Sequence, residues 1–249
     1  ESTPWLTERH GYDPTLQQTI REMTKHLMEL GDEDWGRYAF RHEPLERKLS
    51  EAQKETYTRL AMECGREEAD LIKTGFPECT VEEVVRAKGI QIKTPDIPNG
   101  GGHVIFAQYE ESGRITIFMD CIKKAEELIA GEQMEDLFKG ADLFSVLLAH
   151  ELFHAVEQEK RKTIFTQTEK IELWKRPFSN KSRLIALSEM AAMAFAGRME
   201  RLSFSPYVLD VVLMYCYNQE AARALYEEIM EAVSGEEEND ADNKRENWK

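Results

Sequence analysis

Two histidines separated by three residues lie in an otherwise apolar stretch near the middle of the chain, LFSVLLAHELFHAVEQ (residues 143–158). The length and composition of this stretch predict a largely buried α-helix. Residues four apart share one face of a helix, so the side chains of His150 and His154 project in the same direction. Because buried histidines need polar partners, we expect the fold to place a polar group or a cation where both imidazoles can bind it.

Two imidazoles on one helix face can bind one metal ion. Imidazole nitrogen suits Zn²⁺, which in catalytic sites takes three protein ligands and leaves a fourth position to water. Glu151 follows His150 directly, and its carboxylate can take a proton from that water and pass it to a leaving amine. We therefore expect His150 and His154 to be metal ligands, Glu151 to be a general base and Zn²⁺ to be the cofactor. The alternative is a helix whose histidines face solvent or fill a polar pocket.

The third ligand has to come from elsewhere in the chain, and Glu189 is the main candidate. Between Leu184 and Ala196 only Ser188 and Glu189 are polar. A lone carboxylate in an apolar helix is costly unless a cation or hydrogen-bond donors satisfy it. The chain after His154 is long enough to leave one helix, cross a loop and return. The alternative is that Glu189 is a surface or helix-capping acid.

Three other acids are rivals for the third position. Glu157 lies one turn beyond His154 on the same helix, so we expect it to point past a site centred on the two histidines. Glu169 and Glu172 belong to a charged stretch that we expect to be exposed.

The rest of the pattern predicts an α+β fold that is mainly helical, with one small sheet. A polar, aromatic loop is expected through Trp35 and Phe40, and Leu71 is expected to face inward. Helices are expected at 15–30, 44–73, 80–89, 122–130, 141–160, 181–203, 206–217 and 219–233. A strand is expected at 90–93, and a β-hairpin at 103–109 and 114–120 after a loop that contains Gly100–Gly102. If one hairpin strand lies at the sheet edge, an extended peptide could pair with it.

Composition excludes several classes of protein. The formal net charge is −15, which argues against direct binding of nucleic acid or of an anionic membrane. No apolar run approaches the roughly 20 residues of a membrane span, and the first residues lack the pattern of a secretory signal. Cys64, Cys79, Cys121 and Cys216 show no paired spacing, so we expect free buried thiols in a reducing cytoplasm.

The two central segments resemble those of the ImmA/IrrE-type metallopeptidases, a compact group of gluzincins. The resemblance rests on AHELFHAVE (149–157), on LSEMAAMAFAGRM (187–199), and on the preceding order of TVEEVVRAKG, IQIK and RITIFMD. It implies a zincin-like fold, zinc bound by His150, His154 and Glu189, and Glu151 as the general base. It also implies a bacterial protein that cleaves or inactivates a protein partner, often a DNA-binding repressor or regulator.

Two positions depart from the usual pattern of that family. Phe153 stands before the second histidine, where a small residue is usual, which changes the packing behind the metal. The family's E-x-E-A pattern aligns its first acid with Glu189 and its second with Ala191. If the ligand belongs to the second position, this chain has lost it.

Together these observations predict a cytoplasmic zinc endopeptidase that acts on a protein or peptide partner, and they specify no oligomeric state. The expected parts are an N-terminal helical extension (1–50), a zincin-like metallopeptidase domain (51–234) and a disordered acidic tail (235–249). A metal-containing regulatory protein that binds its partner without cutting it is the alternative, and a hydrolase of non-protein substrates is a third. The spacing selects no oxyanion-stabilising group among the candidates, which are His103, Tyr109, Tyr207, Tyr215 and Tyr217.

Overall fold

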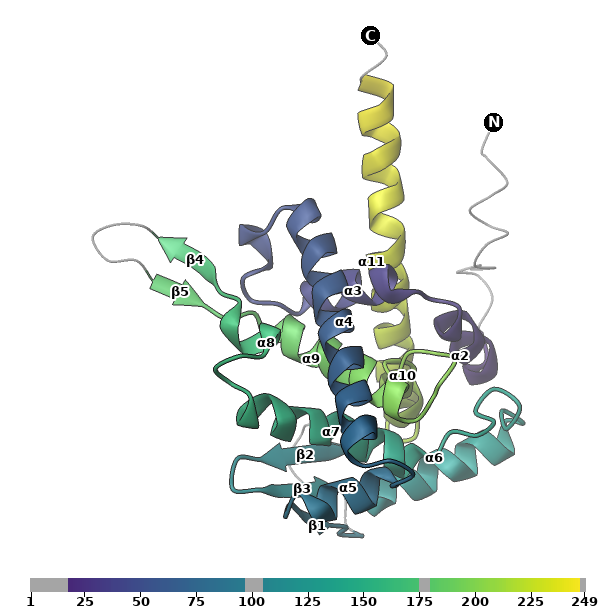
Figure 1. The fold of residues 1–249 in the computed structure, drawn as a ribbon. Helices are drawn as coiled ribbons and strands as arrows, with labels where there is room; N and C mark the ends of the chain where they lie inside the picture. Colours follow the sequence, from purple (N-terminus) through teal and green to yellow (C-terminus); the bar gives the residue numbers. More distant parts are fainter. Residues whose placement is uncertain (1–17, 97–104, 175–179, 247–249) are drawn as a thin grey trace.

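A computed structural model describes residues 18–96, 105–174 and 180–246, and it belongs to the mainly helical α+β class that the sequence predicts (Figure 1). Its helices are α2 (Ile20–Met28), α3 (Asp32–Arg41), α4 (Glu51–Gly75), α5 (Val81–Ala87), α6 (Met119–Gly131), α7 (Leu143–Glu159), α8 (Phe165–Thr168), α9 (Ile185–Met199), α10 (Val208–Tyr215) and α11 (Gln219–Glu246). Its strands are β1 (Gln91–Lys93), β2 (Ala107–Glu110), β3 (Arg114–Ile117), β4 (Ile171–Trp174) and β5 (Asn180–Ser182). Within the described residues, none of the helices has an apolar run long enough to cross a bilayer.

The main sheet has the strand order β1-β3-β2, with β1 parallel and β2 antiparallel to the central strand β3. The predicted hairpin is confirmed, although its strands are shorter than expected. Strand β2 is at the edge, and both β2 and β3 contact helix α7. The predicted glycine-rich loop and His103 lie outside the described residues. The helix with the two histidines therefore packs against this sheet.

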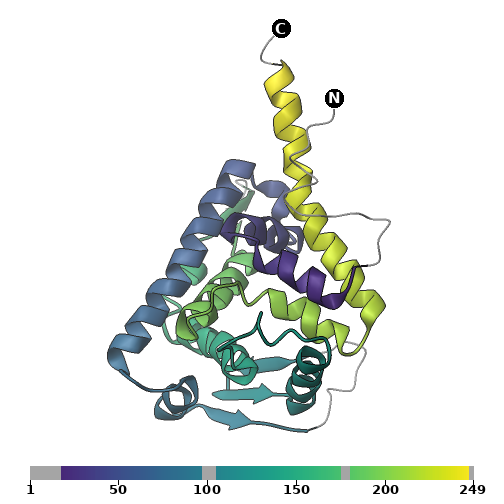
Figure 2. The ribbon, with the colours of Figure 1, turned by 90° about the vertical axis from the view of Figure 1, so that its right-hand side faces the viewer.

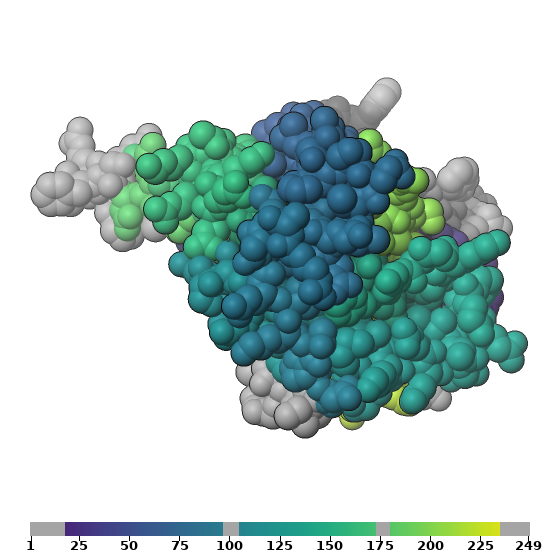
Figure 3. Space-filling view, turned by 60° about the horizontal axis from the view of Figure 1, so that its bottom comes forward, coloured from purple at the N-terminus to yellow at the C-terminus, as the bar shows by residue number. Residues whose placement is uncertain are grey.

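Helix α9 packs against both α7 and α4, and α4 runs along one side of the molecule, where it is the blue helix at the left edge of Figure 2. Gly65 of α4 lies so close to α9 that a Cβ atom at this position would be 2.1 Å from the carbonyl oxygen of Ala191. The absence of a side chain thus lets the two backbones approach directly. In the space-filling view, blue residues that include α4 form a continuous band across the face shown (Figure 3).

The segment predicted as a loop through Trp35 and Phe40 is instead helix α3. Three acids in its first turn suit the positive end of a helix dipole, and both aromatic side chains are fully buried. Gly36 interrupts the helical pattern in the sequence, but in the structure a Cβ there would be 2.2 Å from Thr58 Oγ1 of α4. Gly36 therefore makes the helix hard to predict from the sequence, and it is also the residue that lets α3 pack closely against α4.

Other elements also differ from the prediction. The segment 44–73 begins with a 3₁₀ turn (Glu46–Lys48), and α4 starts only after Ser50, whose side chain caps it. Leu71 is 57% exposed, because Ile72 takes the inward direction on this turn. Strands β4 and β5 form a second, two-stranded sheet that was not expected. Helix α11 continues to Glu246, through most of the segment for which the sequence predicts disorder.

The four cysteines are free thiols, as expected. Cys64 and Cys121 are buried, and burial raises the pKa of both thiols, to about 11 and about 12. Cys79 is exposed and Cys216 is only partly buried, so the expectation of buried thiols is wrong for Cys79 and is met only in part for Cys216.

Candidate metal centre

Helix α7 is fixed at its start and along its length. The carboxylate of Asp142 caps it by accepting hydrogen bonds from the backbone N–H groups of Phe144 and Ser145. Leu148, Leu152 and Phe153 are fully buried along it. The ring of Phe153 packs against Phe195 of α9, with 5.6 Å between ring centroids. The bulky residue before the second histidine is thus the contact that joins the two helices behind the site.

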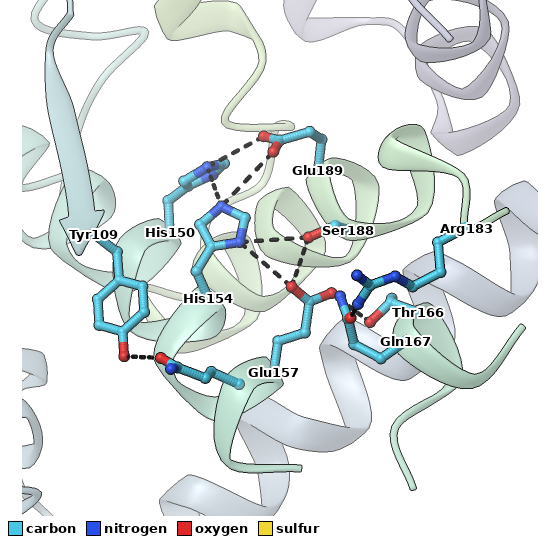
Figure 4. Close-up of polar contacts among 10 residues, drawn as sticks. Tyr109, His150, His154, Glu157, Thr166, Gln167, Arg183, Ser188 and Glu189 are labelled. Atoms are coloured by element: carbon cyan, nitrogen blue, oxygen red, sulfur yellow. Dashed lines mark hydrogen bonds and ion pairs between the residues drawn. The ribbon is translucent and has the colours of Figure 1, made fainter. Parts of the chain in front are cut away.

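The structure brings His150, His154 and Glu189 together (Figure 4). The two Nε2 atoms are 3.2 Å apart, Glu189 Oε2 is 3.5 Å from Nε2 of His150, and Oε1 is 3.8 Å from Nε2 of His154. Four ligands at about 2.0–2.1 Å from a tetrahedral ion are about 3.3 Å apart. The three side chains therefore already lie close to the spacing that such an ion requires, and this group could hold a metal ion.

The three side chains differ in exposure, which is 14% for His150, 20% for His154 and 44% for Glu189. The donor set is two neutral nitrogen ligands and one carboxylate, a combination that fits Zn²⁺. The two Nε2 atoms approach within hydrogen-bonding distance, so in the absence of a cation one of them has to carry a proton. A metal ion would take the place of that proton.

Glu189 controls the charge of the metal-free site. Burial lowers the pKa of His150, but the hydrogen bond to Glu189 and the charges of Glu151 and Glu189 outweigh it and raise the value to about 9. Burial raises the pKa of Glu189, but His150 and His154 outweigh it and lower the value to about 2. The metal-free site is therefore an ion pair at neutral pH.

Glu157 does not join the three metal-facing groups, and as expected it lies beyond them. Its Oε2 is 3.8 Å from Nδ1 of His154, the ring nitrogen that faces away from Glu189 (Figure 4). Ser188 and Thr166 donate hydrogen bonds to the same carboxylate at 2.9 and 2.5 Å. Burial raises its pKa, but the hydrogen bonds outweigh this and hold it below the usual value. Glu157 is therefore a buried anion beside the second histidine, and the hydroxyl of Ser188, 3.4 Å from Nδ1 of His154, links the two.

The other two rivals do not reach the site. Glu169 accepts a hydrogen bond from the hydroxyl of Tyr57 at 2.9 Å, and Glu172 lies in strand β4, where it is exposed.

A cavity of about 430 Å³ opens beside His150 and Glu189. His150, Glu151 and Glu189 form one side of it, and the start of strand β2 with Phe106 forms another. Glu151 is only 7% exposed and therefore faces this cavity rather than bulk solvent. The remaining wall comes from helices α3 and α10. Some of the residues in this wall were not predicted from the sequence to lie near the site.

Of the oxyanion candidates within the described residues, Tyr207 lines this cavity. Its hydroxyl is buried and makes no hydrogen bond in the described part of the chain. The hydroxyl of Tyr109 is bonded to Gln158, and that of Tyr217 donates to Asp120 at 2.6 Å. Burial first, and then the charges of Glu189 and Asp210, raise the pKa of Tyr207 well above its usual value, so it stays a donor.

Helix α3 holds Tyr207 in place. The indole ring of Trp35 stacks on the Tyr207 ring at 5.2 Å and 17°, and the ring of Tyr38 contacts it edge-on at 5.7 Å. These two residues lie in the segment that the sequence predicts as a loop, so their contribution to the site was missed.

No protein-family model, curated protein or solved structure matches the chain. The site itself offers a three-residue position for a metal ion, with His150, Glu189 and Glu151 lining one cavity and the buried hydroxyl of Tyr207 in its wall.

Proposed function

We propose that this protein is a zinc-dependent endopeptidase with a zincin-like fold, similar to the ImmA/IrrE-type metallopeptidases. The observation that carries the proposal is the placement of Glu151 in the same cavity as His150 and Glu189. A purely structural zinc site has four protein ligands and no need of an adjacent acid. Three metal-facing groups with a carboxylate beside them favour catalysis.

Bound zinc would polarise a peptide carbonyl and lower the pKa of a water molecule. In this proposal His150, His154 and Glu189 hold the metal. Glu151 accepts the proton of the attacking water and delivers it to the leaving amine. Tyr207 donates its unpartnered hydroxyl to the oxygen that becomes negative during the attack.

The edge of the main sheet supports a peptide substrate over a small one. Strand β2 has a free edge in the described sheet, and the residues at its start line the cavity beside Glu151. An extended peptide that pairs with such an edge fixes its main chain by hydrogen bonds and places alternate side chains toward the helix. We therefore take the substrate to be an extended segment of a cytoplasmic protein, with a regulator or repressor as the leading candidate.

The test combines metal analysis with cleavage. Purified wild-type protein should contain one zinc per chain, and His150→Ala should contain none. Glu151→Gln should keep the zinc but lose cleavage of a co-expressed regulator or of an unstructured protein such as casein. Glu159→Gln is the matched control, because Glu159 lies on the same helix but pairs at the surface with Lys88. Absence of zinc, or zinc that survives in His150→Ala, would contradict the site.

The same experiment separates the alternatives. Zinc without any Glu151-dependent cleavage, together with stable capture of a partner, would favour a metal-containing binding protein. Glu151-dependent hydrolysis restricted to non-protein substrates would favour a hydrolase of another class.

A further inference from the structure

The cavity beside the metal-facing residues contains a third carboxylate, in addition to Glu151 and Glu189, that the proposed mechanism does not use. Asp210 lies in the first turn of α10 and lines this cavity. In the described part of the chain its carboxylate accepts no hydrogen bond and forms no ion pair. Burial and the charge of Glu189 raise its pKa, His150 lowers it, and the balance is about 7. A half-buried carboxylate beside apolar walls is stabilised by a cationic partner.

Two tyrosine hydroxyls lie within the electrostatic influence of Asp210. After burial, the charge of Asp210 is the next cause that raises the pKa of Tyr38, and it also raises that of Tyr207. Neither hydroxyl hydrogen-bonds to the carboxylate. The cavity is therefore lined by a carboxylate and by Tyr38, whose hydroxyl does not satisfy that carboxylate.

Most of the remaining wall of the cavity is apolar, with His42 as a polar exception. Phe106, Val146, Leu147 and Leu209 are among its apolar lining residues. A ligand that fits needs an apolar stem and a polar end with several hydrogen-bond donors. The guanidinium group has five donors in a plane and pairs with a carboxylate through two parallel bonds, while its three methylenes pack against apolar walls.

We propose that this cavity binds a basic side chain of the substrate, arginine in preference to lysine, with Asp210 as its counter-ion. This inference rests on the peptidase function proposed above, because it places that side chain next to the bond that is cut. An apolar side chain of the same size would displace water from Asp210 and leave the carboxylate without a partner.

The first test measures cleavage preference. The zinc-loaded protein is given a degenerate peptide mixture, and then matched peptides that carry arginine, citrulline or leucine beside the bond that is cut. Citrulline has nearly the shape of arginine but no charge. We expect arginine to be preferred, and Asp210→Asn to lower kcat/KM for the arginine peptide by about thirtyfold or more while sparing the citrulline peptide. Equal cleavage beside leucine, or an arginine preference that survives in Asp210→Asn, would overturn the inference.

Two further variants serve as controls for the cleavage preference. Asp136→Asn makes the same change of charge at an exposed position paired with Arg21, and it should leave the preference unchanged. Tyr38→Phe removes one hydroxyl and keeps the ring, and it should weaken the arginine preference by up to about tenfold. Zinc content and the thermal midpoint of each variant show whether the site and the fold persist.

The second test does not depend on cleavage. Binding of N-acetyl-arginine amide and of its citrulline analogue is measured by calorimetry on zinc-loaded Glu151→Gln, with and without Asp210→Asn. Asp210-dependent binding of the arginine amide supports the cavity even if the protein cuts no peptide, in which case the proposed function fails alone. Cleavage without such binding and without arginine preference would remove this inference and leave the peptidase. If the protein shows neither Asp210-dependent binding nor Glu151-dependent cleavage, both this inference and the proposed function are rejected.

Discussion

The carboxylate of Glu43 accepts a hydrogen bond from the backbone N–H of Ala186 at 3.0 Å, although the two residues are far apart in the chain. Helix α9 begins at Ile185, and the residue before it offers no side-chain cap. Glu43 is 5% exposed, so a buried carboxyl group from the loop after α3 caps the helix that carries Glu189. The start of α9 is thus fixed one turn before the candidate metal ligand.

Replacement of Glu43 by alanine should lower the free energy of unfolding by about 1–2 kcal/mol, the usual cost of a lost helix cap. Glu55→Ala is the control, because Glu55 is exposed on α4 and bonds to no group in the described residues. Urea unfolding of the metal-free proteins measures both. Equal stability of the two variants would show that the hydrogen bond to Ala186 does not cap α9.

Replacement of Gly65 by alanine should destabilise the protein by about 1–3 kcal/mol, because the added methyl group meets the carbonyl oxygen of Ala191 and separates α4 from α9. It should also weaken zinc binding, since α9 carries Glu189. In Gly75→Ala the new methyl group meets no atom within 4 Å, so stability should change little or rise. Chemical unfolding and a zinc competition assay distinguish the two. A Gly65→Ala variant as stable as Gly75→Ala would contradict the packing described.

Replacement of Phe153 by alanine should cost about 3–5 kcal/mol, because the side chain is fully buried against Phe195. Leu71→Ala removes a large apolar side chain that is 57% exposed and should change stability by less than about 1 kcal/mol. The midpoints of urea unfolding report both changes. If Phe153→Ala were as mild as Leu71→Ala, this ring would not hold α7 against α9.

Replacement of Glu157 by glutamine should weaken zinc affinity by about 10- to 100-fold while leaving all three proposed ligands in place. The carboxylate beside Nδ1 of His154 favours a proton on that nitrogen and so leaves Nε2 free for the metal. Competition with a chromophoric chelator measures the affinity, and Glu159→Gln is the surface control on the same helix. Unchanged affinity would mean that Glu157 is only a structural anion.

Zinc binding near pH 7.5 should release close to one proton from the site. The pKa of His150 in the metal-free protein is about 9, so the imidazole is protonated there and has to lose that proton to become a ligand. Calorimetry in buffers of different ionisation enthalpy counts the released protons. Glu189→Gln should release fewer, because the carboxylate that raises the pKa is gone. Equal release by both proteins would contradict this cause.

The same ion pair sets a pH window for the stability of the metal-free protein. The contribution of His150 is full below its ordinary pKa of 6.5 and is lost as the pH rises through about 9. That of Glu189 is full above its ordinary pKa of 4.5 and is lost as the pH falls through about 2. Wild type should therefore exceed Glu189→Gln in stability most between pH 4.5 and 6.5, and the difference should shrink toward alkaline pH.

The metal-facing residues could be predicted because their signals are local. His150 and His154 share a helix face by spacing alone, and Glu189 stands out as an acid among apolar residues. The position of Glu157 could be predicted only in part. The helix pitch shows that its side chain misses the metal position, but it does not show that the carboxylate lies beside Nδ1 of His154. That contact depends on Thr166 and Ser188, which come from two other helices.

The far wall of the cavity could not be predicted in the same way. Tyr38 and Trp35 lie in a segment whose acids and central glycine resemble a loop, and it becomes helical because it packs against α4 and α11. Tyr207 and Asp210 look like ordinary members of an apolar helix until α3 is placed beside them. Their significance is a property of tertiary contacts, which no local pattern encodes.

The division of the three metal-facing residues between α7 and α9 has a mechanical consequence. Two of them are four residues apart, whereas the third joins them only after residues 160–184 have closed a loop. A zinc ion bound as proposed would therefore be a cross-link between two helices as well as a reagent. A protease cut within that loop should leave α7 and α9 packed through Phe153 and Phe195, and a chelator should then lower the thermal midpoint of the cut protein more than that of the uncut chain.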